Sequence, residues 1–194
     1  FENLLSQMYS DFDPDIKVTS KNQTFFSKND FNFGELDSSQ IDYALTIENK
    51  VLAKYEDKQF LTNLKGVSKN YENVTRINGF VKEIFFDKNN SYNHVYLGLG
   101  LANNIGIQNE SFNKTLSFFY PNFKTNTGFG VKPYNSDKAI VNKIFSFASD
   151  VDNDFTISEI EFAQNLFSKN GLISAIEIKV KNKKDLNTVI KYLK

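Results

Sequence analysis

Several residue types that carry chemistry are scarce or missing in this chain of 194 residues. It has no cysteine and no tryptophan, one histidine (His94) and one arginine (Arg76). The missing cysteines exclude disulfides, thiolate catalysis and cysteine-based metal sites. His94 lies in the strand-like run HVYLGLG without a second histidine to share a metal. We therefore interpret it as a half-buried or edge side chain of a sheet.

The chain also lacks an excess of either charge and has no long apolar run. Its 23 basic and 23 acidic residues cancel. Nucleic-acid affinity comes largely from clustered Lys and Arg side chains on phosphates, so the balance argues against a nucleic acid partner. No run approaches the roughly 18 apolar residues of a membrane-spanning helix, and no signal peptide opens the chain.

What is present is enough apolar surface for a folded domain: 40% hydrophobic residues, with 20 Phe and 9 Tyr. Their periodicity predicts a mixed α+β fold with a hairpin over residues 45–67 that turns at Glu56 and Asp57. Further strands are predicted at 15–20, 81–86, 94–100, 115–121, 138–149 and 175–180. Helices are predicted at 36–44, 101–107, 157–167 and 185–193.

The run DVDNDFTISEIE has the carboxylate spacing of an EF-hand calcium loop. Asp150, Asp152 and Asp154 take positions 1, 3 and 5, and Glu161 takes position 12. Position 6 needs a positive φ and is normally Gly, whereas here it is Phe155. The preceding segment is also strand-like instead of helical. We interpret the run as an acidic strand-to-helix turn without a metal.

Motifs of enzymes are similarly incomplete. The run GLGLANNIG follows a strand and opens a helix, as a dinucleotide fingerprint does, but Asn103 replaces its third glycine. A tight strand-to-helix connection accounts for it better. No GxSxG motif and no localisable Ser/His/Asp set is present. We predict that this chain is not an enzyme and holds no cofactor.

Both ends of the chain have helical patterns, FENLLSQMY and DLNTVIKYLK. The first residue is Phe and not Met. We therefore expect one domain taken from a longer protein, and we expect it to be monomeric in isolation.

The order of the motifs resembles a known family. In sequence they are DFDPDIKVTS, NKVLAKYEDKQFLTNLKGVSKNYENVT, YLGLGLANNIGI, IFSFASDVDNDFTISEIEFAQNLF and SAIEIKVKNKKDLNTVIKYL. This order resembles the periplasmic core domain of MacB-type ABC-transporter permeases, and most closely the lipoprotein-releasing branch of LolC and LolE. The resemblance covers essentially the whole chain.

The resemblance implies a periplasmic domain of an inner-membrane protein, set between two membrane helices. It implies a Porter-like split βαβ subdomain from both chain ends, residues 1–75 plus 172–194, and a Sabre-like mixed α/β subdomain over residues 76–171. ATP would be hydrolysed by a separate cytoplasmic subunit. The permease, working with a second permease, would extract lipoproteins and pass them to a LolA-like carrier. A MacB- or FtsX-like role in efflux or in control of a cell-wall hydrolase stays open, as does a calcium-binding module.

The segment 122–135, NFKTNTGFGVKPYN, is the candidate contact with the carrier. It is too long for a tight hairpin turn and carries apolar residues in a polar insertion. In LolC-like permeases this position holds a protruding hook. By position, the candidate hook residues here are Phe123, Thr127, Gly128, Phe129, Val131 and Pro133. The alternative is that Phe129 and Val131 fold back onto the body as core.

Overall fold

The structure is a computed structural model of the chain. It describes residues 13–31, 39–75, 92–107, 114–122 and 132–193. Its strands are β1 (Ile16–Val18), β2 (Phe26–Ser27), β3 (Ile41–Tyr55), β4 (Lys58–Val67), β5 (Asn93–Gly98), β6 (Lys114–Pro121), β7 (Tyr134–Phe145), β8 (Phe155–Glu159), β9 (Leu172–Ile173) and β10 (Ala175–Val180). Its α-helices are α2 (Tyr71–Val74), α4 (Leu99–Ile105), α5 (Ser149–Asp154), α6 (Ile160–Phe167) and α7 (Leu186–Tyr192). Two short 3-10 helices are η1 (Lys28–Asp30) and η2 (Lys183–Asp185).

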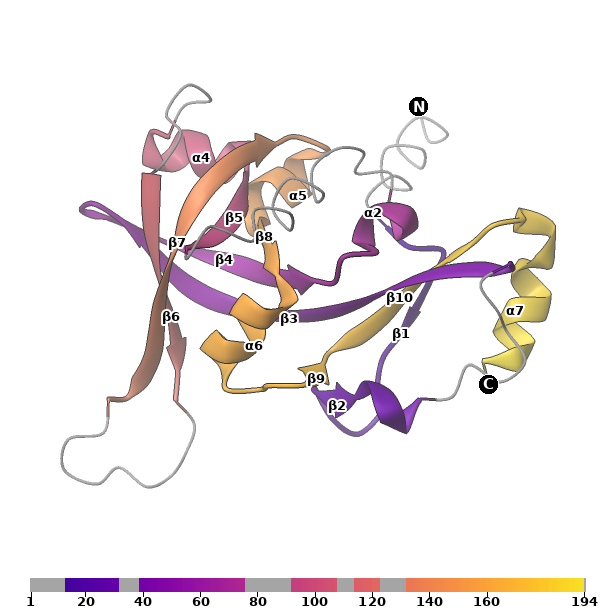
Figure 1. The fold of residues 1–194 in the computed structure, drawn as a ribbon. Helices are drawn as coiled ribbons and strands as arrows, with labels where there is room; N and C mark the ends of the chain where they lie inside the picture. Colours follow the sequence, from indigo (N-terminus) through magenta and orange to yellow (C-terminus); the bar gives the residue numbers. More distant parts are fainter. Residues whose placement is uncertain (1–12, 32–38, 76–91, 108–113, 123–131, 194) are drawn as a thin grey trace.

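The long hairpin of β3 and β4 is the backbone of the fold (Figure 1). Its strands pair in continuous antiparallel register from Thr46 opposite Val67 to Tyr55 opposite Lys58. Glu56 makes the turn with a positive φ of 51°. The predicted hairpin and its turn are thus confirmed. Because the register has no interruption, side chains alternate between the two faces over the whole length.

Four strands, β5 to β8, close a six-stranded ring together with β3 and β4. β8 runs parallel to β4, β5 runs antiparallel to β8, and β7 runs parallel to β5. β6 then pairs antiparallel with β7 and returns to β3 at Leu52–Lys54. The strands between residues 93 and 159 therefore form a closed ring with one end of the hairpin.

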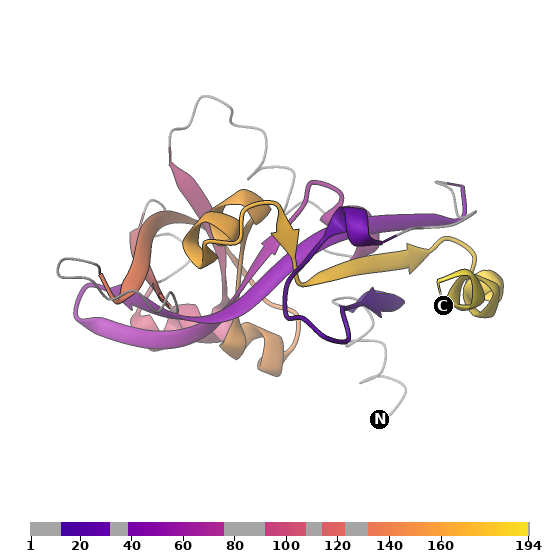
Figure 2. The same ribbon diagram turned by 90° about the horizontal axis from the view of Figure 1, so that it is seen from below.

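The first half of β3 extends out of this ring and pairs with β10, which in turn pairs with β1. β2 and β9 form a separate two-stranded sheet nearby. Both views show an elongated molecule with the β3–β4 turn at one end and α7 at the other (Figures 1 and 2). Strands from the start and the end of the described chain thus lie side by side.

Helices cover the hairpin near its base on both faces. A Cβ built on Gly66 of β4 would lie 2.6 Å from Ala163 Cβ in α6, so this helix packs directly on one face. On the other face, α2 and α5 contribute Tyr71, Val74 and Val151 to a second cluster with Val67 and Phe145. The two clusters give the sheet a core on each side.

The α+β class is confirmed, and two local predictions are corrected. The helix predicted over 36–44 is wrong for Ile41–Ala44, which begin β3 because β10 pairs with them. The helix predicted from residue 157 begins at Ile160, because residues 155–159 form β8 between β4 and β5. The helix expected at the start of the chain and the strand at 81–86 lie outside the described residues. The division into 1–75 plus 172–194 and 76–171 stays a prediction.

Candidate interaction groove between the hairpin and β6

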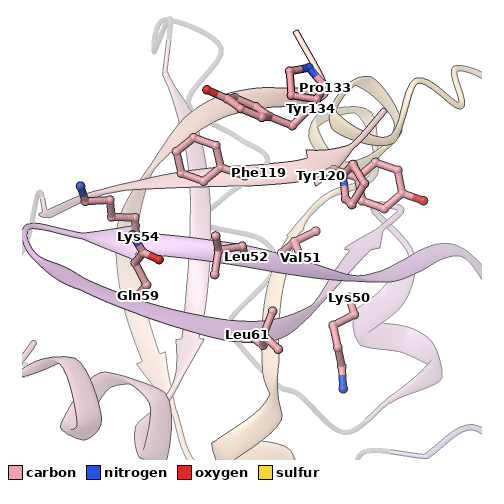
Figure 3. Close-up of a pocket in the computed structure, with 11 residues that line it drawn as sticks. Lys50, Val51, Leu52, Lys54, Gln59, Leu61, Phe119, Tyr120, Pro133 and Tyr134 are labelled. Atoms are coloured by element: carbon pink, nitrogen blue, oxygen red, sulfur yellow. The ribbon is translucent and has the colours of Figure 1, made fainter. Parts of the chain in front are cut away.

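An apolar groove of about 520 Å³ lies where the β3–β4 hairpin meets β6 and the start of β7 (Figure 3). Leu52 and Leu61 contribute from the hairpin, and Phe119 and Tyr120 from β6. Pro121 and Pro133, at the two ends of the β6–β7 connection, and Tyr134 line it as well. The volume is in the range of small-molecule sites in proteins.

The register of the strands assembles the floor of the groove. Val51 and Ala53 are buried in the core, so the alternating side chain of Leu52 points out of the sheet. Leu52 is the register partner of Leu61 on β4 and of Phe119 on β6. Three apolar side chains from three strands therefore form one row across the outer surface. Leu61 is 61% exposed.

Aromatic packing and one polar contact shape the wall toward β6. The rings of Phe119 and Tyr134 meet edge to face at 5.5 Å between centroids. The Tyr120 hydroxyl accepts a hydrogen bond of 3.0 Å from Asn49 Nδ2. Burial raises the pKa of Tyr120, although the Asn49 contact acts in the opposite direction. Tyr120 is thus a neutral, anchored side chain at neutral pH.

The predicted hook residues can be placed only at their base. Asn122 N–H donates a 2.9 Å hydrogen bond to the Pro133 carbonyl, which ties the two ends of the connection together. Pro133 lies on the rim of the groove. Phe123, Thr127, Gly128, Phe129 and Val131 lie outside the described residues. Their role stays a prediction.

The EF-hand-like run is neither a calcium loop nor the predicted strand-to-helix turn, because a helix and a strand fill most of it. Asp150, Asp152 and Asp154 belong to α5 and Glu161 belongs to α6, with β8 between them. Phe155 has an ordinary φ of −108°.

The carboxylate of Asp152 is already used within the fold. It accepts 2.8 Å hydrogen bonds from Ser146 Oγ and Phe147 N–H. Within the described ranges, no three His, Asp or Glu side chains are grouped so that they could hold a metal ion. The calcium-module alternative therefore has no support in the geometry.

The glycine-rich run at Gly98 serves packing. A Cβ at this position would overlap the backbone carbonyl of Asp152. The missing side chain therefore lets α5 lie against the end of β5, at the point where α4 begins. This agrees with the interpretation as a tight strand-to-helix connection.

A buried ion pair was not foreseen from the sequence. Lys65 Nζ on β4 lies 2.8 Å from Glu177 Oε1 on β10, and their side chains are 4% and 0% exposed. Thr46 Oγ1 donates to the same carboxylate at 3.3 Å, and the ammonium lies 5.0 Å from the centre of the Tyr71 ring. Nothing in the local pattern of LTNLKGV marks Lys65 as buried, because its partner is far along the chain.

Electrostatics in this cluster favour the charged lysine. Burial alone would lower the pKa of Lys65, but its contacts with Tyr71 and Glu177 outweigh this and raise it. Burial raises the pKa of Tyr71, so its hydroxyl stays protonated. No lining residue of the groove belongs to this cluster. We interpret the pair as a structural link between β4 and β10.

Solved structures give the clearest comparison. The extracellular domain of the noncanonic ABC-type transporter YknZ from Gram-positive bacteria superposes with a TM-score of 0.57 at 9% identity, covering 90% of this chain and 86% of that one. The two chains share a fold. The superposition covers most of both chains, so the shared fold is not confined to a small part of this one.

Two further structures are more distant. The periplasmic region of MacB from Actinobacillus actinomycetemcomitans reaches a TM-score of 0.47 at 16% identity, covering 81% of this chain and 69% of that one. A domain of a putative permease from Porphyromonas gingivalis reaches 0.43 at 12%, covering 83% and 65%. No protein-family model matches the chain, and no curated protein is similar to it in sequence. Of the helices in the described ranges, none has the length and apolarity to cross a membrane.

Proposed function

We propose that this chain is a non-enzymatic extracytoplasmic domain of an ABC-transporter permease. The observation that carries the proposal is the fold shared with the extracellular domain of YknZ over 90% of the chain. The domain itself needs no cofactor for this role. A separate cytoplasmic subunit hydrolyses ATP, and the permease conveys the resulting motion to this domain.

The arrangement of β1 and β10, the first and last strands of the described chain, supports an attachment to a membrane on both sides of the domain in sequence. The Asp15 carboxylate, just before β1, accepts a 2.9 Å hydrogen bond from Val180 N–H at the end of β10. It also pairs with the Lys179 ammonium at 3.1 Å. The chain thus enters and leaves this sheet at the same place. Two membrane helices that continued from these strands could then lie next to each other.

The finer proposal is lipoprotein release from the inner membrane and transfer to a LolA-like carrier in the periplasm. The β6–β7 connection would contact the carrier, and two prolines hold its base beside the apolar groove. Lipoproteins, the cytoplasmic ATPase and a second permease are the further partners. The second candidate is a role in efflux or in control of a cell-wall hydrolase. YknZ is described only as a transporter, so the shared fold does not favour either candidate.

Purification of the full gene product tests the coarser proposal. From detergent-solubilised membranes it should bring down an ATP-hydrolysing subunit in a stoichiometric amount. Recovery of the product from the soluble fraction without an ATPase would contradict the proposal.

Capture of a carrier tests the finer proposal. The 194-residue chain is immobilised and compared with a variant that lacks residues 126–132, and Tyr192→Ser, an exposed change on α7, is the matched control. We expect a LolA-like carrier to bind the intact chain and the control but not the shortened variant. Equal capture by all three would discredit the hook and favour the second candidate.

A further inference from the structure

The groove has a distinctive distribution of charge. Lys50 and Lys54 lie on the same face of β3, on either side of Leu52, and both contribute to the groove. In Figure 3 their side chains lie on opposite sides of the row formed by Leu52 and Leu61. Four residues of strand separate their Cα atoms by about 13 Å. The groove is therefore an apolar strip with an ammonium group on each side of it.

The two lysines are available to a ligand. Within the described ranges neither forms an ion pair or a side-chain hydrogen bond, and no Asp or Glu lines the groove. The whole chain has equal numbers of acidic and basic residues, so this local excess of positive charge is a property of the site. It is complementary to an anion.

The floor between the lysines is formed by the apolar side chains of Leu52 and Leu61, and Gln59 is a polar residue on the lining. Of the four large exposed hydrophobic side chains in the described residues, Leu61 and Tyr134 line this groove. Exposed apolar side chains that are grouped in one groove, as these are, often mark a binding site. Leu52 is paired on both sides, with β4 and β6, so β3 has no free strand edge at Leu52 for a peptide to extend. The chemistry that fits is a flexible hydrocarbon chain with one charged end.

We propose that this groove binds an anionic single-chain amphiphile, such as a fatty acid or a monoacyl phospholipid. The alkyl chain lies over Leu52, Leu61 and Phe119, and the anionic head pairs with the ammonium of Lys50 or Lys54. Each lysine can also lay its own methylene stem along the apolar strip while its charge stays in water. The inference goes beyond the proposed function, because it holds whether or not the domain is coupled to an ATPase.

Matched ligands test the head group separately from the chain. Dodecanoate, dodecyltrimethylammonium and dodecyl maltoside have alkyl chains that differ by only about one carbon, and they differ in charge. Titration calorimetry on the 194-residue chain, below each micelle concentration, measures their affinities. We expect dodecanoate to bind about tenfold more tightly than the cationic ligand, a difference that two exposed charges can supply. Butanoate, which keeps the head but lacks the chain, should not bind measurably.

Two kinds of variant separate the contributions of the protein. Lys50→Glu with Lys54→Glu should reverse the preference, so that the cationic ligand binds best. The single variants show which lysine holds the head. Leu61→Gln should weaken all three long-chain ligands by a similar factor. Tyr192→Ser on α7 is the control and should change nothing. Thermal unfolding midpoints of all variants confirm that each one is folded.

Three results would overturn the inference. The first is equal affinity for the three head groups, and the second is an anionic preference that survives in the double variant. The third is an affinity for the long-chain ligands that Leu61→Gln leaves unchanged. Binding that begins only at the micelle concentration would count against the inference in the same way. Carrier capture is measured without amphiphile, so a failure here is distinguishable from a failure of the proposed function.

Discussion

The base and the tip of the β3–β4 hairpin use the same sheet face in opposite ways. Alternation places Leu61 and Lys65 on one face of β4, four residues apart. At the base Lys65 is a charge that is 4% exposed on its side chain, whereas at the tip Leu61 is a hydrophobic residue that is 61% exposed. The polar side chain is buried and the apolar one faces water.

The difference comes from what covers each half. Over the base, α2 covers this face, so the Lys65 and Glu177 side chains are shielded from water. Each charge is then stabilised by the other, because no water is there to solvate it. Over the tip no described element closes the face, and the same face becomes the floor of the groove. We interpret the buried side chains at the base as contributing to stability, and the exposed side chains at the tip as available for binding. The following variants test this division, from the largest expected effect to the smallest.

Loss of one partner of the ion pair should have the largest effect. Glu177→Leu leaves the Lys65 ammonium buried without a counter-ion, and we expect a loss of about 3–5 kcal/mol in the free energy of unfolding. Urea unfolding measures it. Because Lys65→Met removes the stranded charge, the double variant should lose clearly less than the sum of the two single variants. Strict additivity would show that the two side chains do not interact.

Filling the contact between β4 and α6 should come next. The Cβ of Gly66→Ala would meet Ala163 Cβ at 2.6 Å and the Ile160 Cα at 3.1 Å, so the helix must move. Overpacking of this kind costs about 1–3 kcal/mol. Ala163→Gly removes the opposing atom. In that background Gly66→Ala should cost less, and an unchanged cost would place the strain elsewhere.

Glu159, the register partner of Val67 at the base, should make stability depend on pH. Burial, helped by the nearby Glu161, raises the pKa of this carboxyl above its ordinary value of 4.5, although Lys69 opposes the shift. A carboxyl with a higher pKa in the folded chain destabilises the fold once it is ionised in both states. We expect Glu159→Gln to raise the unfolding midpoint at pH 7. The advantage should shrink as the pH falls toward and below 4.5. A lower midpoint at pH 7 would contradict this reasoning.

The smallest effect on stability is expected at the tip. Leu61→Gln should change the free energy of unfolding by less than about 0.5 kcal/mol, since most of the side chain already lies in water. Leu64→Ala, on the same strand but fully buried, is the matched comparison and should cost about 2–5 kcal/mol. Similar losses in the two variants would mean that the tip is covered after all.

Local sequence signals predicted the elements that are stabilised locally. Alternation and a two-residue turn identified the hairpin. β8 was missed because the spacing of Ile157, Ile160 and Phe162 fits a helix equally well. Pairing with β4 and β5 decides that its first part is a strand. Residues 41–44 were misassigned for the same reason, since their partner strand lies near the other end of the chain.

The candidate site was predicted only at its margin. The hook hypothesis pointed to the 122–135 segment, and Pro133 does line the groove. The row of Leu52, Leu61 and Phe119 was not predicted, because it depends on the register of β6 against β3. Register between distant strands has no local signature.

The sequence by itself determined the mixed α+β class, the long hairpin and the absence of any disulfide. The tertiary structure alone decided which half of the hairpin is covered, and hence that Lys65 meets Glu177 inside while Leu61 remains outside. The reason is that alternation assigns a side chain to a face of its strand, whereas the packing of remote strands and helices decides whether that face meets water.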